Sequence, residues 1–325
     1  MVKVSVIVPV YNAQEYLEEC LESLVHQTLE EIEIVCVNDG SNDASPDILT
    51  KYQEKYPQKV IVISKENGGQ ASARNLGIRR CSGEYIGFVD ADDYVAEEMF
   101  EKMYHRAKLE DSDYIECRYR YLQVTETGET KKLLCYGNVR PFYRTEEMFF
   151  DPLVSPWNKL YRAKILKDNS ILFPEGFVYE DTSFYVKAIP FIKKASFEPE
   201  EYVYHFLRAG STMNAKKDKR VGNIFPVIED VINFYKKNQL WDLYHNELEY
   251  FCTKILLCSS LARIADVKDT DLKRTYMKKT IGMMQMYFPG YRQNTYIKKS
   301  KKGLYMRCIS PYTIKLVVWL LRFHR

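Results

Sequence analysis

The chain has 325 residues, of which 46% are hydrophobic and 28% are charged. These globular values exclude a disordered or fibrous protein and allow one large domain or two modest ones. The net charge is only +3, but residues 272–325 contain 13 Lys and Arg and no acidic residue, which leaves −10 for the rest. This asymmetry predicts an anionic partner surface for the C-terminal end.

The cysteine pattern and the lack of targeting signals favour a cytoplasmic location. The eight cysteines are scattered and none forms a Cys-x-x-Cys pair, which is typical of reduced thiols rather than of a disulfide framework or a zinc site. The chain enters an apolar run at once, without the pattern of a signal peptide. No apolar run reaches about 18 residues, so we expect no membrane-spanning helix.

Strands and helices alternate through the first part of the chain. Short apolar runs predict buried strands, and apolar residues at helical spacing predict helices between them. The predicted strands are 4–10, 32–38, 60–63 and 85–89, and the predicted helices are 15–27, one that begins at 43–45, and 71–81. Such alternation indicates a parallel sheet with helices on both faces, in which ligands bind at the carboxyl ends of the strands.

Polar residues suited to a nucleotide follow these predicted strands. Tyr11 offers an aromatic face for a base; the alternative is an ordinary surface tyrosine. Asp39 accepts a hydrogen bond from the N–H of a base such as uracil; the alternative is a residue that caps a helix or a turn. Gly68 and Gly69 precede a helix whose N-terminus favours an anion. Arg74 adds a positive charge, unless it is a surface ion-pair partner. The chain contains neither a Gly-x-Gly-x-x-Gly turn nor a P-loop, which disfavours dinucleotide and P-loop sites.

The last of these strands runs into three carboxylates, Asp90, Asp92 and Asp93. Asp90 and Asp92 would point the same way along a strand, and like charges at this distance repel. A divalent cation such as Mg²⁺ or Mn²⁺ holds carboxylate oxygens together and keeps positions for substrate phosphates. The alternative is a solvated acidic loop or a helix cap.

Residues 4–12, 38–43, 67–75 and 83–93 together resemble, in order, type and spacing, the N-terminal domain of family 2 glycosyltransferases. The resemblance implies an α/β fold of GT-A type, with a Rossmann-like, mostly parallel sheet flanked by helices. It also implies that Tyr11 and Asp39 hold the uracil of a UDP-sugar. The implied donor-site residues are Pro9, Tyr11, Asn12, Asp39, Asn67, Gly68, Gly69, Arg74, Asp90, Ala91 and Asp92. The resemblance further implies that the metal ion that accompanies the diphosphate, Mn²⁺ or Mg²⁺, is bound by Asp93 in the first place and by Asp92 in the second.

A second pair of carboxylates, Glu180 and Asp181, follows an aromatic, turn-rich segment at 173–179. By itself, Asp181 is equally well explained as the N-cap of a helix over 182–188. Beside an Asp-x-Asp-type cluster it resembles the general base of the family, with Glu180 as an orienting residue. Trp157 either stacks on an acceptor sugar or belongs to the core.

Residues 202–212 resemble the segment that closes over the donor diphosphate in this family. Arg208 suits phosphate recognition there. His205 either completes the metal site or is a core residue packed among aromatic neighbours.

The composition changes after residue 220, and the resemblance covers about the first two-thirds of the chain. Helical spacing predicts a mainly α-helical region, with helices at 221–237, 240–265 and 270–287. We therefore predict a glycosyltransferase domain at 1–215 and a helical region at 216–325. The first is divided into a nucleotide-binding half (1–95) and an acceptor half (96–215).

The C-terminal end, residues 298–325, combines a basic cluster at 298–302 with a short apolar helix at 314–323 that contains Trp319. This combination suits peripheral binding to an anionic membrane surface. The alternatives are that this helix docks on the protein itself or that it forms a dimer contact. The second alternative would make the protein an oligomer. No RNA-binding motif accompanies the basic cluster, so we expect no nucleic-acid partner.

Together these features predict an inverting, metal-dependent glycosyltransferase that moves a sugar from a UDP-sugar to a hydroxyl group of a glycan. Inversion is implied by the resemblance alone. Asp181 would remove the proton of the attacking hydroxyl, while Arg208 and the metal offset charge on the leaving diphosphate. The expected acceptor is a lipid-linked surface polysaccharide, such as a capsule, at the inner face of the membrane.

Two other classes of protein also pair carboxylates with a nucleotide. A sugar-nucleotide nucleotidyltransferase should carry a basic triphosphate-binding loop near the first strand, and residues 9–13 contain no Lys or Arg. A catalytically inactive nucleotide- or glycan-binding protein would tolerate loss of the carboxylates, and Asp90, Asp92, Asp93 and Asp181 are all present.

Overall fold

The computed structural model describes residues 1–124, 130–132, 144–207, 217–299 and 302–323. The chain divides into two compact units. The first consists of Met1–Met148, Pro152–Gly176 and Glu180–Ala209, and the second of Phe149–Asp151, Phe177–Tyr179 and Gly210–Arg325. The predicted boundary between residues 215 and 216 lies outside the described residues, and the division of the first unit into two halves stays a prediction.

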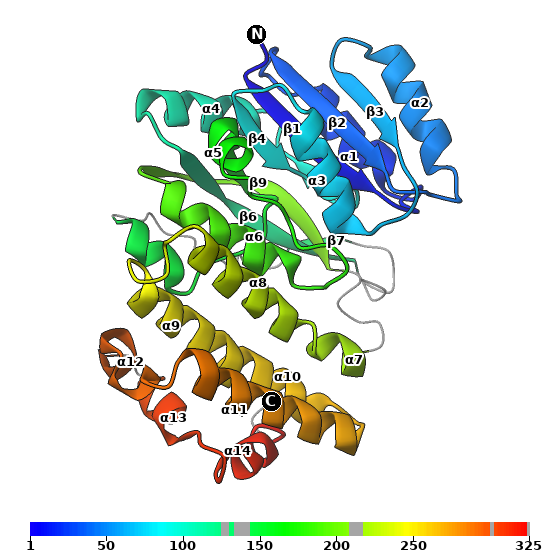
Figure 1. The fold of residues 1–325 in the computed structure, drawn as a ribbon. Helices are drawn as coiled ribbons and strands as arrows, with labels where there is room; N and C mark the ends of the chain where they lie inside the picture. The colour runs from blue at the N-terminus through cyan, green and yellow to red at the C-terminus, as the bar shows by residue number, and fades with distance from the viewer. Residues whose placement is uncertain (125–129, 133–143, 208–216, 300–301, 324–325) are drawn as a thin grey trace. The chain divides into compact units, whose positions relative to one another are not determined.

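A single mixed sheet organises the described part of the first unit (Figure 1). Its strands are β1 (Val4–Val10), β2 (Ile32–Asn38), β3 (Val60–Ser64), β4 (Tyr85–Phe88), β5 (Tyr94–Val95), β6 (Tyr114–Val124), β7 (Thr130–Lys132), β8 (Lys159–Arg162) and β9 (Ala195–Leu207). They lie in the order β3-β2-β1-β4-β8-β6-β9-β5, and β7 pairs with β6.

Most strands of this sheet run in one direction, and β5, β7 and β8 run in the opposite one. β1 pairs in parallel with β2 and β4, and β2 with β3. β8 is antiparallel to both β4 and β6, whereas β6 and β9 are parallel and β5 is antiparallel to β9. The α/β sheet predicted from the sequence is thus confirmed, with its parallel character concentrated in β1–β4.

Helices cover both faces of the sheet. The helices of this unit are α1 (Leu17–Val25), α2 (Ser45–Lys55), α3 (Gln70–Arg80), α4 (Met99–Leu109), α5 (Ala163–Asp168) and α6 (Glu180–Ala188). All seven residues of β1 are buried, because Val4, Val6 and Val8 share a core with α1 while Ile7 faces α3. α3 approaches closely since Gly77 lacks a Cβ, which would lie 2.4 Å from Ile7 Cγ2.

Aromatic packing places α6 on the same sheet. Phe184 of α6 stacks on Phe173 with ring centroids 3.9 Å apart, and both rings meet Phe88 of β4 edge-on at about 5.5 Å. All three side chains are buried. Aromatic pairs of this kind stabilise a fold by more than the burial of their apolar area alone. The start of α6, which carries the predicted base, is therefore held near the end of β4.

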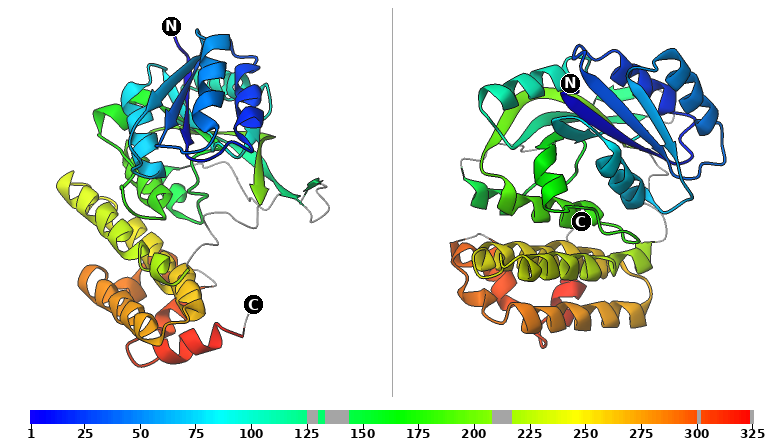
Figure 2. Two further views of the ribbon diagram at one scale, coloured as in Figure 1. Left: turned by 90° about the vertical axis from the view of Figure 1, so that its right-hand side faces the viewer. Right: turned by 45° about the horizontal axis from the view of Figure 1, so that its top comes forward.

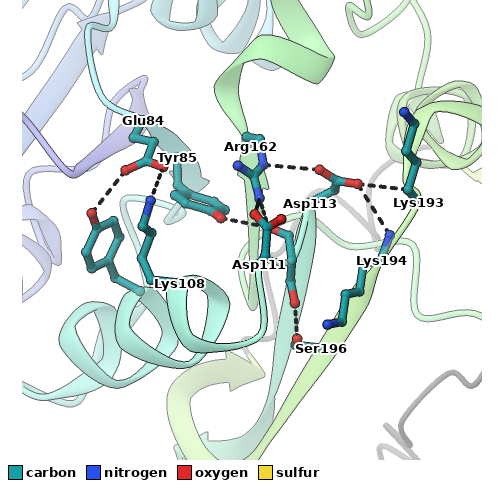
Figure 3. A network of polar contacts seen from close by, with 11 residues as sticks. Glu84, Tyr85, Lys108, Asp111, Asp113, Arg162, Lys193, Lys194 and Ser196 are labelled. Atoms are coloured by element: carbon teal, nitrogen blue, oxygen red, sulfur yellow. Dashed lines mark hydrogen bonds and ion pairs between the residues drawn. The ribbon is translucent and has the colours of Figure 1, made fainter.

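The amino edge of β4 is closed by a polar network (Figure 3). Arg162, at the end of β8, forms ion pairs with Asp111 at 2.7 Å and Asp113 at 3.1 Å. Asp113 also accepts from the backbone N–H of Lys193 at 2.8 Å. Glu84 accepts from Lys108 Nζ at 2.8 Å. This network joins the starts of β4, β6 and β9, at the edge opposite the carboxyl ends of β1–β4.

The second unit is helical, as the sequence predicts (Figure 2). Its helices are α7 (Lys217–Val221), α8 (Ile224–Lys237), α9 (His245–Lys254), α10 (Leu261–Asp266), α11 (Thr270–Tyr287), α12 (Thr295–Lys299), α13 (Gly303–Cys308) and α14 (Ile314–Leu320). Rings of Phe225 in α8 and Tyr276 in α11 lie 5.8 Å apart in its core. Across the described residues, none of the helices combines the length and the apolar character that crossing a bilayer requires.

Two predicted helices of this unit are divided in the structure. The segment 221–237 is divided at Gly222 and Asn223, between α7 and α8. Tyr276 packs directly against Gly222, where a Cβ would lie 2.6 Å from Tyr276 Cε1. The segment 240–265 begins at His245 and contains a π-helical turn, Ile255–Ser260, between α9 and α10. The prediction of 270–287 is confirmed as α11.

Candidate active site

The predicted polar residues meet at the carboxyl edge of β1–β4. Because these strands are parallel, the residues after Val10, Asn38, Ser64 and Phe88 lie along one edge of the sheet (Figure 1). β6 and β9 end at the same edge and bring His205 there. The following contacts show which of these residues touch.

Asp39 organises the loop between β3 and α3. Its buried carboxylate accepts from Gly68 N at 2.9 Å, Gly69 N at 2.7 Å and Lys65 Nζ at 2.7 Å. Asn67 Nδ2 donates to the Asp39 carbonyl at 3.0 Å. The two glycine N–H groups, expected to face an anion, thus face a carboxylate of the protein. A carboxylate has about four acceptor positions, so one is left for the N–H of a base.

Tyr11 and Asn12 form the turn after β1. The Tyr11 side chain is 52% exposed, which fits an aromatic face that receives a base. Asn12 has a left-handed backbone, φ +48°, which Asn tolerates better than most residues. Asn12 Oδ1 accepts from Asn42 N at 2.8 Å, and Asn12 N donates to Ser41 Oγ at 3.1 Å. Pro9 lies within β1, opposite Val37.

Arg74 of α3 is the centre of the candidate site. Its side chain is 2% exposed and bonds three carboxylates; we call these four residues together the Arg74 cluster. Nη2 donates to Asp90 Oδ1 at 2.7 Å, and Nη1 donates to Asp181 Oδ1 at 2.9 Å and to Glu180 Oε1 at 3.1 Å. Burial acts to lower the pKa of Arg74, but the three carboxylates outweigh it and raise the pKa. The guanidinium is therefore permanently charged.

Asp181 has the electrostatic setting of a base. It lies in the first turn of α6, one position beyond the helix start, so it is not the N-cap. Burial raises its pKa to about 7, with Glu180 and Asp90 adding to the rise and Arg74 opposing it. Its side chain is still 27% exposed, so a substrate can reach it. A pKa near neutrality is best suited to proton transfer at neutral pH.

The buried Asp93 pairs with His205, whose side chain is partly exposed. Asp93 Oδ2 lies 2.6 Å from His205 Nδ1, and Asp93 Oδ1 accepts from Phe206 N at 3.1 Å. The hydrogen bond to Asp93 raises the pKa of His205 although burial acts against it. The indole of Trp157 stacks on the His205 ring, 5.2 Å between centroids. Trp157 is 5% exposed, which fits a core residue rather than a ring that stacks on an acceptor sugar.

These contacts bear on the predicted metal ligands. Asp93 is 2% exposed and hydrogen-bonds His205 and the backbone N–H of Phe206, which suits a supporting position better than direct ligation; its role as a ligand stays a prediction. Within the described ranges, no three His, Cys, Asp or Glu side chains are grouped to hold a metal ion. A carboxylate that hydrogen-bonds one ring nitrogen of a metal-binding His is a common supporting arrangement. Asp93 fits that supporting position behind His205, which leaves His205 Nε2 and Asp92 as candidate ligands.

Three residues of the site were missed in the sequence. Lys65 pairs with Asp39, and Gln70 Nε2 donates to Asp90 Oδ1 at 3.1 Å. Asn75 is buried and its amide bonds both backbone groups of Phe173, at 2.8 and 2.9 Å. The signal was the adjacent polar pair Arg74-Asn75 in a helix whose other face must pack on a sheet. Of the predicted residues, Ala91 is buried beside Asp90, and Arg208 lies outside the described residues.

The first half of the chain matches a known protein family. Residues 5–169 match the family model described as glycosyl transferase family 2. EpsH of Bacillus subtilis (strain 168) is 31% identical over 295 residues, which are 85% of this chain and 80% of EpsH. The poly(ribitol-phosphate) beta-glucosyltransferase of Bacillus spizizenii is 34% identical, over 73% of this chain but only 37% of that longer protein.

The fold is also found among solved structures. S. aureus TarS 1–349, crystallised in complex with UDP-GlcNAc, has a TM-score of 0.70 and 23% identity over 94% of this chain and 87% of that one. At this identity the likeness establishes the fold, which is the GT-A-type fold expected above. The family model and the extent of the match to EpsH establish more. The chain belongs to glycosyl transferase family 2 and is a glycosyltransferase.

Proposed function

We propose that this glycosyltransferase moves a sugar from a UDP-sugar to a hydroxyl group of a cell-surface polymer, with inversion at the anomeric carbon. The observation that carries the proposal is the Arg74 cluster, in which one buried guanidinium joins Asp90, on the donor side, to Asp181, the candidate base. The UDP and UDP-GlcNAc complexes of TarS support the donor. The poly(ribitol-phosphate) glucosyltransferase supports a polymer acceptor, here proposed as lipid-linked and cytoplasmic.

The transfer is a single displacement. The acceptor oxygen forms a bond to the anomeric carbon as the bond from that carbon to the UDP oxygen breaks. Asp181 takes the proton of the acceptor hydroxyl, and UDP leaves with the bonding electron pair. Arg74 holds Asp181 Oδ1 at 2.9 Å and so fixes the direction from which the carboxylate meets the acceptor. Glu180, bonded to the same Nη1 at 3.1 Å, orients the guanidinium.

The donor would lie along the loops after β1, β2 and β3. Tyr11 offers an exposed ring for the uracil to stack on. Asp39 keeps one acceptor position for the base while it shapes the glycine loop at Gly68 and Gly69. Asn67 supports this loop from its other side. Arg208, proposed for the diphosphate, follows β9 directly.

A divalent cation fits this site with two protein ligands. Asp92 and His205, through its second ring nitrogen, would hold Mn²⁺ or Mg²⁺, and Asp93 would orient His205. Such ions are commonly bound by one or two protein groups together with substrate phosphates. When bound, the cation would offset the negative charge of the departing diphosphate.

The test is release of UDP from a panel of UDP-sugars by the full chain, with an acceptor glycan and Mn²⁺. Asp181→Asn keeps the shape of the side chain and two of the three carboxylates around Arg74. It should reduce kcat by about a thousandfold or more while UDP still raises the melting temperature. UDP at about 100 times its Kd should add roughly 2.7 kcal/mol to stability. Asp168→Asn, on the exposed end of α5, is the matched control.

Three results would contradict the proposal. Wild-type stabilisation by UDP without turnover of any UDP-sugar would indicate an inactive binding protein. Full activity of Asp181→Asn would exclude Asp181 as the base. A preference for GDP or CMP over UDP would overturn the donor class.

A further inference from the structure

The C-terminal helix α14 has two apolar faces. Ile314 and Val318 are 4% and 3% exposed, and α14 packs against α10 (Figure 1). A second row is exposed to solvent: Leu316, Trp319 and Leu320 lie on one face of α14, and Phe323 follows at the same spacing in the turn after it. We call this row the α14 face; its exposed fractions are Leu316 57%, Trp319 53%, Leu320 45% and Phe323 68%.

The α14 face is a continuous patch. The rings of Trp319 and Phe323 touch edge-on, with centroids 5.0 Å apart. Single exposed apolar residues are ordinary on protein surfaces, but a row of four large ones that includes a tryptophan marks an interaction site. Tyr312, 94% exposed, stands just before the helix. Tyr and Trp are the residues enriched where protein meets the interface of a membrane.

The charged residues of this end of the chain are basic. Lys315 is exposed on α14, Arg322 is exposed just after that helix, and Lys298 and Lys299 are exposed on α12. No acidic residue occurs from residue 272 to residue 325. A partner surface must therefore accept apolar side chains and be negatively charged, which describes the anionic leaflet of a phospholipid bilayer.

Other partners match this surface less well. In a symmetric dimer the same patch meets itself, so the lysines and arginines of both copies would be brought together. Nucleic acid would satisfy the positive charges but would leave the row of aliphatic and aromatic side chains without a role.

We infer that the α14 face docks this enzyme on an anionic bilayer, with the four apolar side chains in the interface and the basic residues against lipid phosphates. The helix has seven residues, so it lies in the plane of the surface and does not cross it. This inference goes beyond the sugar transfer proposed above. It would place the enzyme where a lipid-linked acceptor is presented.

The test is flotation of the full chain with vesicles of phosphatidylcholine, with and without phosphatidylglycerol. We expect binding only to the vesicles that contain phosphatidylglycerol, weakened by added salt. Leu316→Ala/Trp319→Ala should weaken binding by about tenfold or more. Lys315→Gln should weaken it by about fivefold, the loss expected for one basic residue near the surface. Leu243→Ala is the matched control, since Leu243 is also an exposed leucine of the helical unit, 72% exposed.

Intrinsic fluorescence gives a second readout. Trp319 should shift to shorter wavelength on addition of anionic vesicles, and Trp319→Phe should bind without that shift. Equal flotation of wild type and Leu316→Ala/Trp319→Ala would overturn the inference, and so would equal binding to neutral vesicles or no binding at all. A dimer in lipid-free solution that the double variant disrupts would assign the face to a second copy instead. None of these readouts depends on sugar transfer.

Discussion

Replacing Arg74 by Met should destabilise the first unit more than any other single loss of charge at the candidate site. The Arg74 side chain is 2% exposed, and the side chains of Glu180, Asp90 and Asp181 are 11%, 17% and 27% exposed. Methionine fills much of the volume but leaves three partly buried carboxylates without a counter-charge. Removing one partner of a buried ion pair costs about 3–5 kcal/mol.

The loss should depend on pH in a defined direction. The native pKa of Asp181 is raised to about 7 even with Arg74 present, so without Arg74 it rises further. A carboxyl whose native pKa lies above its unfolded value costs stability when ionised, above that pKa. The penalty of Arg74→Met should therefore be largest above pH 8 and shrink toward pH 5, as Asp181 becomes protonated in the native state.

Native-state hydrogen exchange of the full chain is the suitable assay, because the slowest amides of β1 and β2 report opening of the first unit alone. At pH 8, Arg74→Met should exchange about a hundredfold to several thousandfold faster than wild type. Arg79→Met, at the exposed end of the same helix, should change stability by about 0.5 kcal/mol or less. A loss below about 1 kcal/mol for Arg74→Met, or a loss equal at pH 5 and pH 8, would refute the electrostatic account.

Three further predictions use the same structure. The kcat/KM of wild type should rise with pH through about 7, as Asp181 loses its proton; a profile flat from pH 5 to 9 would exclude it as base. Asp39→Asn weakens the three hydrogen bonds from Gly68, Gly69 and Lys65. It should lower stability by about 2 kcal/mol and weaken UDP binding in calorimetry. Lys159→Met should destabilise by about 3–5 kcal/mol in urea unfolding because Glu116 lies 3.6 Å away and both are buried. Adding Glu116→Gln should recover much of this loss.

The elements of the fold that could be predicted are those whose burial follows from the pattern of apolar residues within the segment itself. β1 and β2 are mostly apolar and buried along their whole length because both faces are covered, and α11 follows its apolar spacing from Thr270 to Tyr287. β8 was not predicted. Its four residues include Lys159, and lysine is ordinarily exposed. The reason for its burial, Glu116, lies 43 positions earlier, so no local pattern carries it.

The candidate site shows the same limit. Spacing alone placed Asp39, Asp90 and Asp181 at strand and helix ends, where ligands bind. It did not show that Asp39 holds the glycine loop or that Asp93 supports His205, because both depend on contacts between distant segments. For Arg74, a surface ion pair was the alternative reading, and the structure places the side chain in the interior instead.

One helix links the two sides of the proposed reaction. α3 begins directly after Gly69, whose N–H is fixed by Asp39, and Arg74 follows little more than one turn later with its hold on Asp181. The glycine loop and the base are thereby attached to the same rigid element. A donor that draws Asp90 away from Nη2 of Arg74 would leave Glu180 and Asp181 as the carboxylates paired with the guanidinium. That shift would lower the pKa of Asp181, because Arg74 is the main group that opposes its rise, ahead of Lys159. Donor binding would then favour the ionised base before an acceptor arrives.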